Sequence, residues 1–400
     1  MNDLPPVDVL IVGAGMFVCG RGTPGYGTIL PAIVQLKRDG IVGRIQVAAS
    51  RAGSVRTLRG KLEELNRCLG TDLAVEAVPV EGTDPRAYLR LLEKLPDRSC
   101  VIVAVPDHLH SEIGSEVLRR GRDLLMVKPL APTADECQRL IDLAREHGCH
   151  AVVEYHKRWD WANLKLKEAY QRSQLGTWLY GIVEYSQRRT IPLKVFGEWT
   201  QRTNIFHYLG VHYVDIIYFA TGAQPLRVLA TGQRTWLAQH GLDTYDAIQA
   251  IVEWKMPGSD TSFVLTLLTS WVDPDTTTAV SYQAIKVIGT EGRFESDQKD
   301  RGLRVITASG VADINPYFHQ SYPVPGSASR EFRGYGIESV QQFVKDVRLI
   351  RAGKARPSDL AATRPTFSQA LTASAVAEAV TTSLEQGSSW VPVRPAPAVP

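Results

Sequence analysis

Two closely spaced glycines, Gly13 and Gly15, follow directly after the short apolar run Val9–Val12. An apolar strand that ends in such glycines and leads into a helix is typical of a dinucleotide-binding turn. The first glycine allows the tight turn, and the second lets the backbone approach a pyrophosphate, whose charge lies on the N–H groups at the helix start. The third position of the usual pattern holds Val18 rather than glycine or alanine, so we expect a longer loop. The alternative is a buried strand followed by a flexible loop.

The end of the next predicted strand, Ile45–Ala49, bears on the choice of cofactor. An Asp or Glu there would bind the ribose 2′-hydroxyl of NAD, but the chain has Ser50 and Arg51 instead. A hydroxyl and a guanidinium suit a 2′-phosphate, so the sequence predicts NAD or NADP as cofactor and leaves the preference open. The alternative is that Arg51 is a solvated turn residue.

Composition and charge exclude several classes of protein. The 400 residues suggest two or three domains, and the hydrophobic fraction of 44% is ordinary for a globular chain. A net charge of +3, mixed in sign, gives no indication of nucleic-acid binding. No run of about 18 apolar residues predicts a membrane span, and the N-terminus does not resemble a signal peptide. The five cysteines form no CxxC pair, which favours reduced thiols in a cytoplasmic protein without a metal site.

Strands and helices alternate over the first 150 residues, which predicts a doubly wound parallel sheet in a domain of residues 1–153. Ligands of such sheets bind at the carboxyl ends of the strands. Three predicted strands end in chemically informative residues, namely Gly13–Gly15, Pro106–His110 and Lys128–Pro129.

The pattern changes in residues 154–390. Longer runs alternate apolar and polar residues, which predicts a large, mostly antiparallel sheet with one solvated face. A helix is expected over Ile205–Thr221, and Glu295–Arg333 is expected to be irregular. The Pro-rich tail 391–400 is expected to fray.

Five segments, in this order, resemble the glucose-fructose oxidoreductase / inositol dehydrogenase / MocA family. They are AVPDHLH (104–110), MVKPLAPTADE (126–136), YHKRWDWAN (155–163), YLGVHYVD (208–215) and VIGTEGRFES (287–296). The resemblance implies an N-terminal Rossmann domain and a C-terminal α+β domain with an open sheet. That sheet often pairs with another subunit in the family, so a homodimer or homotetramer is expected.

The chain departs from the family pattern in two of these segments. Val127 stands in place of the Glu of the Lys-Pro motif, and Tyr208 in place of the Asp four residues before the helix histidine. Either change could alter the chemistry while keeping the fold.

The same resemblance implies catalytic roles for Lys128, His212 and Tyr208. Lys128 would lie between nicotinamide and substrate, and burial would lower its pKa enough to make it a proton partner. His212 would be the general base for the hydroxyl proton, because histidine titrates near neutrality. Tyr208 would hold His212 or donate to the substrate oxygen. The alternatives are a surface lysine at a turn and a tyrosine that packs in the core.

Further residues are predicted to bind the cofactor or the substrate. Beside the glycines, Ser50, Arg51 and Lys128, the predicted cofactor contacts are Met16, Phe17, Pro106, Asp107 and His110. The predicted substrate contacts are His156, Arg158, Trp199, Asn204 and Asp215, which combine polar groups with an apolar platform. Asp107 and His110 are alternatively plain polar turn residues, Trp199 a core residue, and Asp215 a residue that orients its helix.

The sequence thus predicts an NAD(P)-dependent oxidoreductase that acts on a secondary hydroxyl of a sugar, cyclitol or glycoside. A glycoside-cleaving enzyme that uses transient oxidation and elimination is one alternative. A non-catalytic sensor of sugar or cofactor is the other.

Overall fold

The computed structural model describes residues 4–395, which form two compact units. The first unit holds the described part of Met1–Leu130 together with Glu136–His156 and Tyr317–Phe367. The second holds Ala131–Asp135, Lys157–Pro316 and the described part of Ser368–Pro400. The chain therefore crosses between the units more than once.

The first unit contains a six-stranded parallel sheet with the strand order β3-β2-β1-β4-β5-β6. This is the order of the classic dinucleotide-binding sheet, and it confirms the predicted doubly wound fold. The central strands β1, β4 and β5 are almost fully buried because helices cover a parallel sheet on both faces. Their bounds are β1 Val7–Val12, β2 Val42–Ala48, β3 Glu76–Val78, β4 Ser99–Val103, β5 Asp123–Val127 and β6 Ala151–Glu154.

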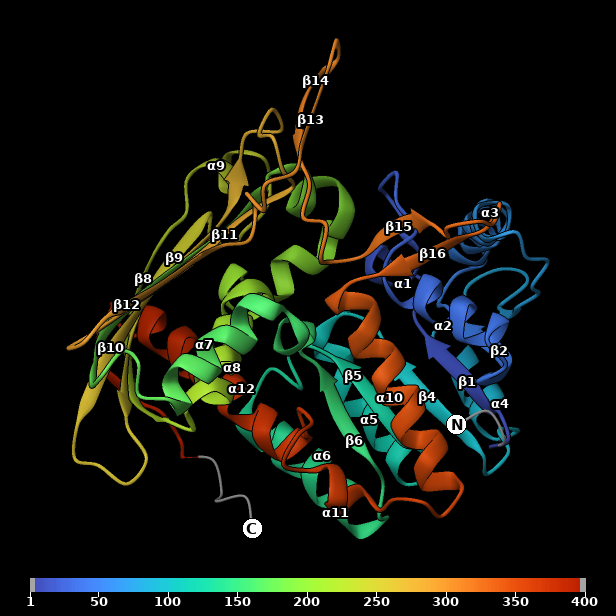
Figure 1. Cartoon of the computed structure of the whole chain (residues 1–400), viewed down its shortest axis with the longest axis horizontal. Helices are drawn as coiled ribbons and strands as arrows, with labels where there is room; N and C mark the ends of the chain where they lie inside the picture. The colour runs from blue at the N-terminus through green and yellow to red at the C-terminus, as the bar shows by residue number, and fades with distance from the viewer. Residues whose placement is uncertain (1–3, 396–400) are drawn as a thin grey trace. The chain divides into compact units, whose positions relative to one another are not determined.

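The helices of the first unit come from both ends of the sequence. The helix α10 packs on α2 and against β1, β4, β5 and β6, although it lies almost two hundred residues after β6 (Figure 1). Its inward side chains, such as Val340, Phe343 and Val347, join the core formed by the N-terminal strands. The helix bounds are α1 Met16–Cys19, α2 Ile29–Arg38, α3 Ala52–Leu69, α4 Ala87–Leu92, α5 His110–Leu118, α6 Ala134–Glu146, α10 Tyr335–Arg351 and α11 Pro357–Leu360.

The turn after β1 requires its first glycine. Gly13 has a φ of +119°, and a Cβ there would lie 2.1 Å from the Ala104 carbonyl oxygen. The helix α1 is a single turn that ends at Gly20 in the left-handed region, and α2 begins at Ile29. The predicted long loop is thus confirmed, and Val18, at the third motif position, is fully buried in the core.

The second unit is built on a seven-stranded mixed sheet with the order β12-β11-β7-β10-β9-β8-β17. Only the β7–β10 pair is parallel, which confirms the expected mostly antiparallel sheet. The strand bounds are β7 Trp178–Arg188, β8 Gln224–Gln233, β9 Ala247–Lys255, β10 Ser262–Asp273, β11 Ser281–Gly289, β12 Arg293–Asp297 and β17 Val391–Pro392.

One face of this sheet is apolar and covered by helices. Its large buried side chains include Trp178, Trp254 and Leu265. The helices α7 (Trp161–Gln171), α8 (Val211–Thr221) and α12 (Phe367–Glu385) lie on the same side of the sheet in Figure 1. None of the helices in residues 4–395 is long and apolar enough to span a bilayer.

Two expectations about the C-terminal half were wrong. The segment Glu295–Arg333, expected to be irregular, continues β12 and contains two hairpins. These are β13 (Arg304–Thr307) with β14 (Gly310–Asp313), and β15 (Gln320–Pro323) with β16 (Arg330–Arg333). Strands of four residues that are rich in charged and small side chains give little periodic signal.

The tail 391–400 was expected to fray. This was wrong for its first two residues, Val391–Pro392, which pair with β8 as strand β17. The rest of that tail, from 396 onward, lies outside the described residues.

Candidate active site

Lys128 comes directly after β5, at the carboxyl end of the parallel sheet. Burial lowers the pKa of this partly buried lysine to about 7, while the carboxylates of Asp107 and Glu154 act in the opposite direction. Asp107 follows β4 and Glu154 is the last residue of β6, and these two strands lie on either side of β5. An amine that titrates near neutrality can hold or release a proton at ordinary pH. The predicted lysine therefore lies in surroundings that suit proton transfer.

Two other predicted cofactor contacts, Asp107 and His110, shape the turn after β4. Asp107 is buried and accepts a hydrogen bond from the His108 N–H at 3.0 Å. The ring nitrogens of His110 lie 2.8 Å from the Pro129 carbonyl oxygen and 3.0 Å from that of Val105. Burial lowers the pKa of His110. The fully buried His110 ring thus ties the β4 turn to the Lys-Pro turn.

Glu154, the last residue of β6, was missed at the sequence level. Its carboxylate accepts hydrogen bonds from His156 Nδ1 at 2.8 Å and from Ser339 Oγ at 2.7 Å. A charged residue that ends an otherwise apolar buried strand is the signal that could have identified it. The ring of His156, a predicted substrate contact, stacks on Phe17, a predicted cofactor contact, with centroids 6.0 Å apart.

The segment after Pro316 adds aromatic residues to this cluster, which the sequence did not predict. The rings of Phe318 and Tyr335 lie 5.1 Å and 5.6 Å from that of His156. His319 Nδ1 lies 3.1 Å from Thr28 Oγ1, and burial lowers the His319 pKa to about 4, with a smaller contribution from His156. The chain thus returns to the carboxyl end of the first sheet after building most of the second unit.

In the second unit, His212 and Tyr208 both face β7. His212 is buried in the first turn of α8, and its ring lies 6.1 Å from that of Tyr185. Tyr208 lies in the π-helical turn Phe206–Gly210 that leads into α8. Burial raises the pKa of Tyr208 to about 12, although a hydrogen bond with the Gln187 side chain lowers it. The phenol is therefore neutral at ordinary pH and can donate a hydrogen bond but cannot act as a base.

Trp199, the predicted apolar platform, belongs to an aromatic cluster with Tyr208. Its ring lies 4.6 Å from that of Phe196 and 6.0 Å from that of Tyr208. The Tyr208 ring in turn stacks on Trp271 of β10 at 6.4 Å. Trp199 is partly exposed, so one part of its ring is accessible from outside this cluster.

Three predicted substrate contacts are engaged with the protein itself. Arg158 and Asp215 form a buried bidentate ion pair, with Nε–Oδ2 and Nη2–Oδ1 distances of 2.9 and 2.6 Å. Asn204 Oδ1 accepts hydrogen bonds from the N–H groups of Phe206 and His207, both at 3.0 Å, and so caps the turn that carries Tyr208. Of the two roles considered for Asp215, the geometry favours orienting the helix.

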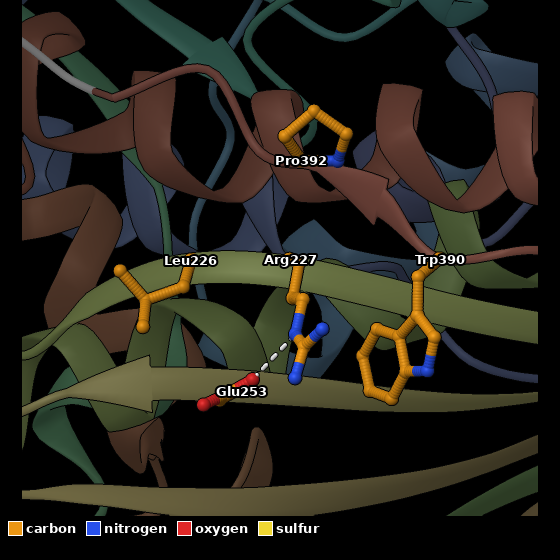
Figure 2. A pocket seen from close by; sticks show the side chains of 5 residues that line it. All are labelled: Leu226, Arg227, Glu253, Trp390 and Pro392. Atoms are coloured by element: carbon orange, nitrogen blue, oxygen red, sulfur yellow. Dashed lines mark hydrogen bonds and ion pairs between the residues drawn. The ribbon is translucent and has the colours of Figure 1, made fainter.

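A surface hollow of about 390 Å³ lies at one edge of the seven-stranded sheet. It is lined by Leu226, Arg227, Glu253, Trp390 and Pro392, none of them a predicted site residue (Figure 2). Arg227 pairs with Glu253 at 2.6 Å and lies over the Trp390 ring, so its charge is already engaged. Within residues 4–395, no cluster of three or more His, Cys, Asp or Glu could hold a metal ion.

Two family profiles match the chain. The profile described as "Oxidoreductase family, NAD-binding Rossmann fold" matches residues 7–155, and that of the GFO/IDH/MocA C-terminal domain matches residues 163–295. The chain belongs to the GFO/IDH/MocA family. It is thus an oxidoreductase-family protein with an NAD-binding Rossmann domain.

One curated relative resembles the chain along about two thirds of its length, and others over a shorter stretch. The scyllo-inositol 2-dehydrogenase (NAD(+)) of Bacillus subtilis is 23% identical over 274 residues, 66% of this chain and 73% of that protein. Other curated relatives align over less than half of their own length, with 36%, 43% and 47% covered.

Two solved structures have the same fold. The scyllo-inositol dehydrogenase of Lactobacillus casei, solved with NAD(H) and scyllo-inositol, is 13% identical and has a TM-score of 0.67, with 97% of this chain and 99% of that chain covered. GenD2 from gentamicin A biosynthesis, solved with NAD, is 18% identical and has a TM-score of 0.68. The match covers 98% of this chain and 97% of that chain. At these identities the likeness shows the fold alone.

The residues at the glycine turn fit the dinucleotide that this family binds. A Cβ on Gly15 would meet no atom within 4 Å, so the backbone there is open to close approach, in contrast to the crowded Gly13. Ser50 and Arg51 are exposed at the end of β2, where Arg51 precedes α3. Exposed hydroxyl and guanidinium groups are compatible with either cofactor, so the preference between NAD and NADP stays open.

Proposed function

We propose that this chain is an NAD(P)-dependent dehydrogenase that acts on a secondary hydroxyl of a sugar, cyclitol or glycoside. The observation that carries the proposal is the partly buried Lys128, held between two carboxylates at the carboxyl end of the Rossmann sheet. The inositol dehydrogenases among its relatives and structural neighbours support a cyclitol or similar polyol as substrate.

In the proposed reaction, nicotinamide supplies the hydride chemistry. The protein's own residues handle the proton and the oxygen. His212 takes the proton of the substrate hydroxyl, and the Lys128 ammonium stabilises the negative charge that develops on the oxygen. The Tyr208 phenol stays protonated, with Gln187 as its partner, and donates a hydrogen bond within the site.

The test is a panel of inositols, hexoses and glycosides, offered with NAD and with NADP, with reduced cofactor measured at its absorbance maximum. We expect turnover on at least one polyol. We expect His212→Gln to lower kcat by about a hundredfold or more, the range for loss of a general base. Far-ultraviolet circular dichroism of the variant should match the parent.

Each other outcome of the panel identifies one of the alternatives. Release of a free sugar from a glycoside with no net reduced cofactor would favour the oxidation–elimination enzyme. A thermal shift with cofactor or sugar but no turnover of any kind would favour the non-catalytic sensor, because binding alone raises apparent stability.

We also propose that the exposed face of the seven-stranded sheet joins two copies of the chain. Tyr180 and Ile182 of β7 and Val264 and Leu268 of β10 are exposed there, and the register places Val264 beside Tyr180. Contiguous exposed apolar side chains of this kind commonly mark an interface between proteins.

We expect the protein to be a dimer or tetramer by size-exclusion chromatography with light scattering. Leu268→Asp should shift it to a smaller species, because the variant would bury an unpaired charge in the interface. Val80→Asp, an equally drastic change at an exposed residue of the first unit, is the control and should leave the mass unchanged. A monomeric parent would contradict the proposal.

A further inference from the structure

The carboxylate of Glu154 is buried, with 2% of the residue exposed, at the end of an apolar strand. A buried charge is tolerated only when it is paired and hydrogen-bonded. Each Glu154 oxygen has a donor, His156 Nδ1 at 2.8 Å for Oε2 and Ser339 Oγ at 2.7 Å for Oε1. The carboxylate is therefore held by groups from two distant parts of the chain, the turn after β6 and the helix α10.

The strand register brings this carboxylate next to the Lys-Pro turn. Glu154 pairs with Val127, the last residue of β5, and Lys128 follows directly after that strand. The charged and titratable groups that surround Lys128 in this unit are Asp107, which follows β4, and Glu154 of β6, with His110 of α5 bonded to the neighbouring Pro129 carbonyl. Glu154 is thus one of two anions that act on the lysine.

The same carboxylate sets the orientation of the His156 ring. That ring stacks on Phe17 with an interplanar angle of 26° and on Tyr335 with an angle of 16°. Phe17 lies in α1, directly after the glycine turn. A hydrogen bond to Nδ1 fixes the rotation of an imidazole about its side-chain bonds. Glu154 therefore also determines the orientation of the His156 ring beside α1.

We propose that Glu154 is a positioning residue whose buried carboxylate, together with that of Asp107, favours the ammonium form of Lys128 and also holds His156 against Phe17. This inference rests on the proposed function, because it assigns a charge state to the lysine that acts on the substrate oxygen. Ser339 completes the arrangement by donating a hydrogen bond to the second carboxylate oxygen.

The test compares Glu154→Gln, which keeps the shape and removes the charge, with Glu154→Asp, which keeps the charge on a shorter side chain. Competitive labelling with acetic anhydride from pH 6 to 10, read for the Lys128 peptide by mass spectrometry, gives the pH at which half of the amine is reactive. We expect this midpoint to fall in Glu154→Gln, by up to about one pH unit, because removing an opposite charge disfavours the ammonium form. Glu154→Asp should retain most of the parental midpoint.

The exposed Glu93→Gln is the matched control and should leave the midpoint unchanged. Thermal melting of each variant shows that it is folded. A purely structural role for Glu154 would give the opposite result. Glu154→Gln would then stay close to the parent, and Glu154→Asp would be the less stable variant. An unchanged midpoint in Glu154→Gln, or an equal shift in Glu154→Asp, would overturn the inference.

The labelling experiment needs neither substrate nor cofactor, so it separates this inference from the proposed function. A shifted midpoint in a protein that turns over no polyol would leave the role of Glu154 intact and count against the dehydrogenase. If turnover is found, the decline of kcat on the alkaline side should move to lower pH in Glu154→Gln by the same amount as the midpoint. An unmoved decline would overturn the inference while leaving the dehydrogenase in place.

Discussion

Replacing Lys128 with methionine is expected to lower kcat/KM for the polyol by about a thousandfold, within the range for loss of a proton-handling or charge-stabilising group. Methionine fills a similar volume but cannot carry the charge that stabilises the oxygen. Because burial disfavours the ammonium form, the variant should melt no lower than the parent at pH 6.

The pH dependence provides the control for this prediction. The pKa of Lys128 is lowered to about 7, so the ammonium is present below that pH and is lost above it. Parental kcat should therefore decline as the pH rises through about 7, because the ammonium is the form proposed to stabilise the oxygen. Lys128→Arg stays charged throughout and should lack this decline, whatever its absolute rate. A methionine variant with more than a tenth of the parental activity would contradict the proposed role.

Replacing Arg158 with methionine is expected to reduce the free energy of unfolding by about 3–5 kcal/mol, because it leaves a buried carboxylate without its partner. The Arg158 guanidinium is buried between Asp215 and the Phe219 ring. Burial already raises the pKa of Asp215, although Arg158 acts in the opposite direction. The loss should be visible as a lower midpoint in urea, followed by circular dichroism.

A double variant distinguishes the ion pair from a substrate contact. Arg158→Met combined with Asp215→Leu removes both charges and should be more stable than Arg158→Met alone, because no charge stays buried and unpaired. If Arg158 instead bound substrate, as the sequence predicted, the single variant would raise KM without lowering stability. That result would contradict the structural role assigned here to the pair.

The strand ends that carry the cofactor half of the site were predictable because their signals are local. An apolar run followed by Gly13 and Gly15 determines a strand and a turn within a few residues. Lys128 could be placed at a strand end for the same reason, since a short apolar run leads directly into it. The alternation of such units was enough to predict the order of elements and the parallel sheet.

Other features depend on residues that are distant in the sequence. Ser339 reaches Glu154 across 185 positions, and Asp215 meets Arg158 across 57. No periodicity within one helix or strand encodes such a partner. For that reason Arg158 was predicted to bind substrate, whereas the structure shows a buried ion pair.

By itself, the sequence determined the two kinds of sheet and the glycine turn, because each depends on short-range pattern. The roles of Lys128 and His212 rest on the family resemblance and stay proposals. Only the tertiary structure decided which polar side chains are engaged with each other, that Tyr317–Phe367 returns to the first unit, and that Glu154 lies one strand away from the Lys-Pro turn. The physical reason is that burial, and with it the charge state of Lys128, depends on every segment packed around the group rather than on its neighbours in the chain.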